Sequence, residues 1–249
     1  MIQIPEVISP TYDRSSISKI NKPPKGAVSR QSVMQLNRVA KVQSQSQDQP
    51  KDSSVSVPSV KQQSVPALVN LLSKGQKTNI GSEIRKVRAC FGWNVLDQRC
   101  DIDASAFLLG ANGKVIDDSW FVFYSQPQSP DGSTVFSVNQ GQSDRETIFL
   151  DLTRVNPNVK KIVFVLTINE AFENNLNFSM VRDTYIRLLD DITGREILSY
   201  RLEENYANVT SMTVAEVYLH NGNWKMNPVG NGMHVDLAGQ CAIYGVEIE

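Results

Sequence analysis

Two carboxylates stand out in this sequence because of their spacing. Asp101 and Asp103 are two residues apart, at the start of a run that is purely apolar by Leu109. Side chains alternate across a β-strand, so both carboxylates and Ser105 would project from one side and Ile102 from the other. Two carboxylates at this spacing repel each other, and a divalent cation with oxygen ligands relieves that repulsion. The alternative is a solvated polar edge of a half-buried strand, which the same alternation also fits.

Other chemistry is harder to find in the sequence. The stretch is not an EF-hand loop, because its sixth position is Ala106 instead of glycine and its twelfth is Asn112 instead of glutamate. There is no P-loop, Rossmann fingerprint, G-x-S-x-G elbow or H-E-x-x-H motif. His220 and His234 lack a second His or Cys at ligand spacing, and Cys100 lies next to a carboxylate that disfavours its thiolate. The sequence therefore predicts a protein that is not an enzyme.

The elements that must position the two carboxylates are strands joined by tight turns. Residues 87–93 alternate between apolar and polar, and residues 161–168 are almost continuously apolar and β-branched, which is typical of a central strand covered on both sides. Asn221-Gly222 and residues 190–194 are hairpin signals. A short helix is expected around residues 235–244. Repeated hairpins with few helices predict an all-β fold, an antiparallel β-sandwich with a few short helices.

Composition divides the chain at about residue 66. Residues 1–66 are rich in Ser, Gln, Val, Pro and Lys, and they carry nine Lys and Arg against four Asp and Glu. Such a segment cannot bury enough apolar surface to offset its chain entropy, so we expect a disordered basic tail. Residues 67–249 hold 16 Lys and Arg against 22 Asp and Glu, and we expect them to form one domain. An acidic body suits cation binding and argues against nucleic acid as a partner.

The compartment is predicted from cysteine use and from hydropathy. The three cysteines are odd in number and show no C-x-x-C spacing, and no signal peptide precedes them, so we expect the reducing cytoplasm. No apolar run approaches the roughly 20 residues that a membrane-spanning helix needs. Residues 33–40 could form a short basic amphipathic helix on a partner or an anionic membrane surface, although a solvated linker is the alternative.

A series of motifs gives a more specific indication. In order, it includes Phe91-Gly92-Trp93, the stretch from Asp101 to Leu109, Asn112-Gly113-Lys114-Val115, Phe121-Val122-Phe123-Tyr124, Asp131-Gly132-Ser133, Ile186-Arg187-Leu188, Asn221-Gly222, Trp224-Lys225 and Tyr244-Gly245-Val246. From about residue 71 to residue 249 the chain resembles the TerD-like tellurium-resistance and general stress family, whose members are calcium-binding β-sandwiches. The resemblance implies a cytoplasmic stress-response protein that acts as a calcium-binding interaction module. It also implies other stress-response or TerD-like proteins as partners, with peripheral contact at the inner face of the membrane.

The resemblance also implies a set of calcium ligands. Asp101 and Asp103 would be assisted by oxygens from Asp118, which the Asn112-Gly113 turn brings near them just before the strand expected at residues 120–124, or from the long polar loop expected at residues 125–145, and sequence order does not decide which. In the family this region carries a Gly- and Asp-rich calcium loop. Its remnants here, the last of which lies just beyond residue 145, are Asp131, Asp144 and Glu146.

Three departures from the family pattern reduce the expected ligand set. Arg99 stands where the family has an acidic residue, Trp120 replaces another, and residues 138–140 read Val-Asn-Gln where Gly-Asp-Asn is expected. An arginine supplies positive charge and no acceptor. We therefore expect one calcium site at most. The alternative is a structural adaptor of the same fold that has lost most metal binding.

Overall fold

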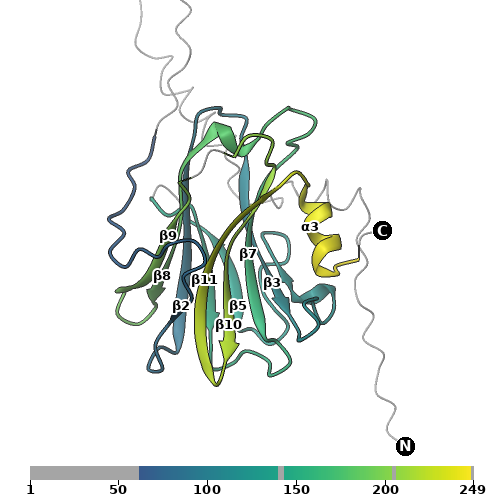
Figure 1. Ribbon diagram of the computed structural model, residues 1–249. Coiled ribbons are helices and arrows are strands. Elements are labelled where there is room, and N and C mark those ends of the chain that lie inside the picture. Colours follow the sequence, from purple (N-terminus) through teal and green to yellow (C-terminus); the bar gives the residue numbers. More distant parts are fainter. Residues whose placement is uncertain (1–61, 140–142, 204–205, 248–249) are drawn as a thin grey trace, which may run out of the picture.

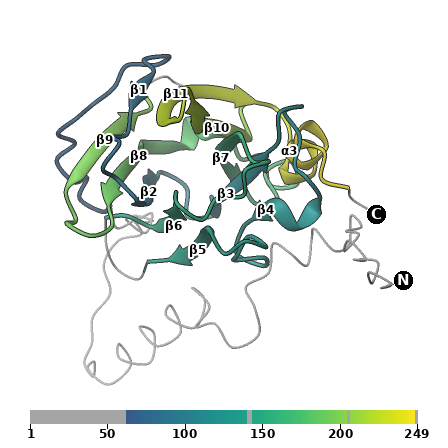
Figure 2. The same cartoon turned by 90° about the horizontal axis from the view of Figure 1, so that it is seen from below.

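The protein is a sandwich of two antiparallel β-sheets, as the sequence predicts (Figures 1 and 2). The computed structural model describes residues 62–139, 143–203 and 206–247. Most of the predicted tail, residues 1–61, lies outside the described residues. None of the described helices is long and apolar enough to cross a membrane.

The larger sheet has six strands in the order β1-β11-β10-β7-β3-β4. In chain order these are β1 (Thr78–Asn79), β3 (Ile102–Leu109), β4 (Phe121–Val122), β7 (Lys161–Ile168), β10 (Ser211–His220) and β11 (Asn223–Met233). β7 lies between β3 and β10, and seven of its eight residues are buried. This confirms the prediction of a central strand.

The smaller sheet has five strands in the order β5-β6-β2-β8-β9. They are β2 (Lys86–Val95), β5 (Thr134–Val138), β6 (Glu146–Asp151), β8 (Val181–Asp190) and β9 (Glu196–Arg201). β5 lies inside the segment 125–145 that was expected to be a loop, so that expectation is wrong for residues 134–138. The alternating pattern in this strand covers only five residues, and the strand is defined by its pairing with β6, for example of Val135 with Phe149.

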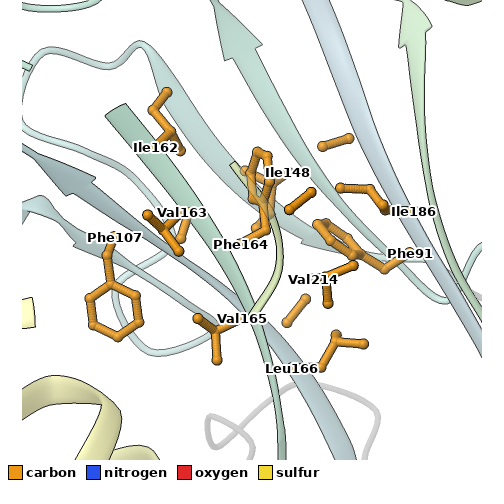
Figure 3. Packing of buried hydrophobic residues seen from close by; sticks show 14 of the residues in the cluster. Phe91, Phe107, Ile148, Ile162, Val163, Phe164, Val165, Leu166, Ile186 and Val214 are labelled. Carbon is orange, nitrogen blue, oxygen red and sulfur yellow. The ribbon is translucent and has the colours of Figure 1, made fainter. Parts of the chain in front are cut away.

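The core lies between the two sheets (Figure 3). Phe164 of β7 meets Phe91 of β2 edge to face, with ring centroids 5.6 Å apart. Burying large apolar side chains of this kind supplies most of the favourable free energy of folding. The ring of Phe107 points away from this interior (Figure 3) and packs against Tyr244, with ring centroids 4.6 Å apart.

The helical elements are short and lie at the ends or on the outer face. α3 (Leu237–Tyr244) covers the outer face of the six-stranded sheet, begins at Asp236, whose side chain accepts the Gly239 N–H, and ends at Gly245 in the left-handed conformation. Single 3-10 turns, η1 (Asp118–Trp120) and η2 (Phe178–Met180), precede β4 and β8. The Asn221-Gly222 hairpin is confirmed, because both residues have positive φ between β10 and β11.

Candidate metal centre

Asp101 and Asp103 lie at one end of the sandwich, where β3 begins. Asp103 is paired with Thr167 of β7, and the backbone N–H of Asn169 donates to the carbonyl oxygen of Asp101 at 2.8 Å. Between the two carboxylates, Ile102 is completely buried in the core. Because side chains alternate along a strand, both aspartates project from the other side of β3. The local register thus gives the arrangement that the spacing predicts.

The phenol group of Tyr124 is influenced by the charges of both carboxylates. Burial raises the pKa of the Tyr124 phenol above its ordinary value, and the negative charges of Asp103 and Asp101 raise it further. Both aspartates therefore act on the same phenol group. Tyr124 follows β4, the strand that pairs with β3.

Glu146 reaches the same strand from the other sheet. It is the first residue of β6, is 1% exposed, and pairs with Phe91, whose side chain lies in the core. Its Oε2 accepts the backbone N–H of Ala104 at 2.6 Å. β4 pairs with β3 only at residues 106–107, so Glu146 satisfies an N–H on the free edge of β3. The glutamate thus binds the backbone of the residue that follows Asp103.

Asp144 faces a different environment, on the outer side of the five-stranded sheet. Arg187 of β8 binds both of its oxygens, with Nη2–Oδ2 2.6 Å and Nε–Oδ1 3.0 Å, and the Tyr185 hydroxyl donates to Oδ1 at 2.9 Å. Burial raises the pKa of the Cys90 thiol to about 11, and the Asp144 charge raises it as well. This carboxylate is therefore neutralised by a protein cation.

Asp131 is held inside a turn. Its Oδ1 accepts from the Ser129 hydroxyl at 2.7 Å and from the Ser133 N–H at 2.9 Å, and its Oδ2 accepts the Asn156 N–H at 2.8 Å. Burial alone raises the pKa of Asp131, but these hydrogen bonds together outweigh burial and leave it below its ordinary value. The side chain ties the turn before β5 to the segment after β6.

Asp118 is buried against the C-terminal part of the chain. Its Oδ1 accepts the backbone N–H of Glu247 at 2.9 Å. Burial raises its pKa, the hydrogen bond from the Glu247 N–H lowers it in part, and the charges of Glu247 and Asp117 raise it. The structure thus places Asp101 and Asp103 at the start of β3 and binds Glu146 to the Ala104 N–H of the same strand. It places Asp118, Asp131 and Asp144 in three other environments.

The residues that depart from the family pattern differ in their burial. Arg99 is exposed and bound to Asp97, with Nη2–Oδ2 2.6 Å, while Trp120 is buried in the core and Val138 is 52% exposed. Gln140 lies outside the described residues. Among residues 62–139, 143–203 and 206–247, no three His, Cys, Asp or Glu side chains are grouped so that they could hold a metal ion.

The thiols offer little nucleophilic chemistry. Cys90, Cys100 and Cys241 are all free and buried. Burial is the largest cause that raises the pKa of each thiol, to about 11 for Cys90 and Cys100 and to about 12 for Cys241. At neutral pH each is a neutral thiol, which is a poor nucleophile.

Sequence patterns did not identify two residues that interact with the candidate ligands. Tyr124 was assigned only to a strand, although it shares its surroundings with Asp101 and Asp103. Arg187 was not identified as the partner of Asp144. A charged residue within the apolar run Ile186-Arg187-Leu188 was the available signal, because a charge in a buried strand needs a partner.

Comparison with known protein families shows to which family this chain belongs. The model of the TerD domain matches residues 69–244. This chain belongs to the TerD domain family. Tellurium resistance protein TerD of Serratia marcescens is 38% identical over 185 residues, which are 70% of this chain and 96% of that protein. General stress protein 16U of Bacillus subtilis is 35% identical over 188 residues, which are 71% of this chain and 97% of that protein.

Solved structures support the TerD fold. The crystal structure of a homologue of TerD from Streptomyces coelicolor A3(2) superimposes with a TM-score of 0.51 at 22% identity. The match covers 62% of this chain and 94% of that one. The family match begins at residue 69, so the segment before it lies outside the matched region.

Proposed function

We propose that this TerD-family chain is a cytoplasmic stress-response protein that acts as an interaction module and binds one calcium ion through Asp101 and Asp103. The observation that supports the calcium part is the position of the two carboxylates at the start of β3, on either side of buried Ile102 in the chain. The names of the relatives, a tellurium resistance protein and a general stress protein, support the stress-response part. Other stress-response or TerD-like proteins are the proposed partners.

The residues present fit one calcium ion in part. Calcium takes about six to eight oxygen ligands, mostly from carboxylates, carbonyls and water. Asp101 and Asp103 supply two carboxylates, while one oxygen of Glu146 is bound to the Ala104 N–H. Asp118, Asp131 and Asp144 do not fit the site, because each is engaged by protein groups elsewhere. The proposed affinity is therefore modest, with water completing the coordination.

Calcium titration with charge-matched variants tests the proposal. A ligand that binds only the folded state adds about 2.7 kcal/mol at a hundredfold excess over its Kd. Calcium should raise the Tm of the full chain, and Asp101→Asn with Asp103→Asn should remove that rise. The control, Glu83→Gln with Glu173→Gln, removes two negative charges at exposed positions and should keep it. An unchanged rise in the aspartate variant would place calcium elsewhere.

The second candidate is a structural adaptor of the same fold that has lost most metal binding. The engagement of Asp118, Asp131 and Asp144 by protein groups favours it. The absence of any calcium-dependent rise in Tm at millimolar calcium would decide for the adaptor.

Contact with an anionic membrane is proposed for the basic tail, which lies mostly outside the described residues. Each Lys or Arg near such a surface adds about 1 kcal/mol, and less as salt rises. Co-sedimentation of the full chain with anionic vesicles at low ionic strength tests this contact, and a chain that stays in the supernatant would remove it.

A further inference from the structure

Residues 62–72, called the strap below, are fastened to the edge and end of the five-stranded sheet. At the strap's start the Asn94 side chain forms two hydrogen bonds with one residue. Its Oδ1 accepts the Gln63 N–H at 2.8 Å, and its Nδ2 donates to the Gln63 carbonyl at 2.9 Å. Near the other end, Oε1 of Glu196 accepts the N–H groups of Val69 at 2.8 Å and of Asn70 at 2.9 Å.

The strap then continues as an added strand on the edge of the sheet. Leu71 pairs in parallel with Ser199 of β9. The Ser199 N–H donates to the Asn70 carbonyl at 2.9 Å, and the Leu72 N–H donates to the Ser199 carbonyl at 2.8 Å. These contacts use the strap's main chain, as in peptides that add a strand to an exposed sheet edge.

A few side chains of the strap add to these main-chain contacts. Val69 is 74% exposed and Leu71 is 50% exposed, whereas Leu72 is 7% exposed and belongs to the core. The Asn70 Nδ2 donates to the Glu196 carbonyl at 3.1 Å. A cavity of about 280 Å³ lies between residues 71–74 and residues 200, 201 and 203, so the strap is not closely packed at its end. Its attachment therefore combines main-chain hydrogen bonds with the side chains of Asn70 and Leu72.

The side chain of Asn94, which binds the strap, is held in place by other residues of the body. Asn94 is 4% exposed, and its Nδ2 also donates to Oδ2 of Asp183 at 3.0 Å. Arg201 holds the other oxygen of Asp183 at 2.6 Å. Asp183 has a φ of +55°, a strained conformation for a residue other than glycine, which persists only where its surroundings fix it. Without a strap, the Asn94 amide would lose its two hydrogen bonds to Gln63 and the edge of β9 would lose its bonds to residues 70 and 72.

The connection from the strap to the body has the features of a hinge. Gly75 has a φ of +78°, and a β-carbon at this position would meet no atom within 4 Å. The Gln76 N–H donates to the Ser73 carbonyl at 3.0 Å, which closes a turn between the strap and β1. A different φ and ψ at Gly75 would redirect the strap without disturbing packed side chains.

We propose that the strap exchanges between two copies of this chain, so that each strap occupies the Asn94, Glu196 and Ser199 positions of the other copy. A second copy is the occupant that fits best, because its identical segment restores every hydrogen bond described above. The exchange changes the hinge, where the Gly75 N–H donates to the Pro228 carbonyl at 2.8 Å, and it costs the entropy of association. It rests on none of the calcium ligands, and it makes the edge of the five-stranded sheet a reciprocal dimer interface.

Cross-linking between two different full-length variants tests the exchange. One variant carries Leu71→Cys and the other carries Ser199→Cys, so a 71–199 disulfide can form only between copies. After joint refolding at high concentration and oxidation, we expect a disulfide-linked dimer, identified by mass spectrometry. Adding Asn94→Ala to the Ser199→Cys copy removes two hydrogen bonds to the strap and should lower the yield about tenfold.

The control pairs Leu71→Cys with Ile116→Cys on the other variant. Ile116 is 42% exposed, whereas Ser199 is 0% exposed, so random collision favours position 116 and exchange favours position 199. Cross-links at 116 with none at 199 would overturn the proposal. Light scattering of the unaltered chain is independent of these substitutions, and a monomer mass before and after concentrated refolding would also overturn it.

Discussion

The ring of Tyr185 lies directly against the α-carbon of Gly92. A β-carbon at Gly92 would come within 2.2 Å of Cζ of the ring. The two residues are Cα partners on β8 and β2, next to a register shift between Gly92 and Asn94. The glycine therefore provides the space that lets the Tyr185 hydroxyl reach Asp144.

Gly92→Ala should destabilise the protein because the Tyr185 ring must move and lose its hydrogen bond to Asp144. Overpacking of this kind costs about 1–3 kcal/mol. Urea unfolding measures the change. Gly110→Ala is the matched control, since its β-carbon would meet no atom closer than 3.4 Å. Equal stability losses at Gly92 and Gly110 would contradict the steric explanation.

Removing one partner of the Asp144–Arg187 ion pair should cost more than removing both. The side chains of Asp144 and Arg187 are 9% and 20% exposed, so Arg187→Met leaves a carboxylate buried without its cation. Such a loss costs about 3–5 kcal/mol, whereas the double variant Asp144→Asn/Arg187→Met should lose less. A double-mutant cycle in urea gives the coupling. Additive losses would mean that the pair contributes nothing as a pair.

A variant of Asp144 tests whether this carboxylate is an ion-pair partner or a calcium ligand. Asp144→Asn should leave any calcium-dependent rise in Tm unchanged, because the carboxylate is bound to Arg187 and Tyr185. Thermal melts with and without calcium measure this. A smaller calcium-dependent rise in Asp144→Asn would bring Asp144 back into the ligand set.

The protein should lose stability in acid as the Asp131 carboxylate becomes protonated. Its folded-state pKa is below the ordinary value of 3.8, so it stabilises the fold above that pH and the contribution is lost as pH falls through the folded-state pKa. Asp131→Asn should flatten the dependence of the unfolding free energy on pH in this range. Asp191→Asn, at a half-buried carboxylate bound to Arg88, is the control position. An unchanged acid slope in Asp131→Asn would show that these hydrogen bonds do not favour the charged form.

Asp118 should have the opposite dependence on pH. Its folded-state pKa is raised mainly by burial, so the folded state holds the proton more tightly than the unfolded chain does. Its contribution is therefore greatest below the ordinary pKa of 3.8 and is lost as pH rises through the folded-state pKa. Asp118→Asn keeps an oxygen for the Glu247 N–H and should remove this loss at neutral pH. A less stable variant at neutral pH would contradict the burial argument.

The fold could be predicted because its signals are local. Asn221-Gly222 predicts a hairpin from two residues, and the apolar run at residues 161–168 predicts a central strand from eight. The candidate site could be predicted only where spacing within one strand decided it, as for Asp101 and Asp103. The partner of Asp144 lies 43 residues away on β8, and no local pattern in the sequence specifies that contact.

The strap gives the last prediction, which compares two truncations of the chain. A chain that begins at residue 62 keeps the hydrogen bonds of Gln63 with Asn94 and of residues 69–72 with Glu196 and Ser199. Its Tm should therefore lie within about 4 °C of the full chain, which corresponds to about 1 kcal/mol or less for a domain of this size.

A chain that begins at residue 73 should melt at a clearly lower temperature. It loses those hydrogen bonds and buried Leu72, and it leaves the edge of β9 without a partner. Because an unpaired edge also favours association, the comparison is made at several concentrations by calorimetry and light scattering. Equal melting temperatures for the two truncations would show that the strap contributes nothing to the body. A large loss already at residue 62 would mean that residues 1–61 stabilise the domain, against the composition of that segment.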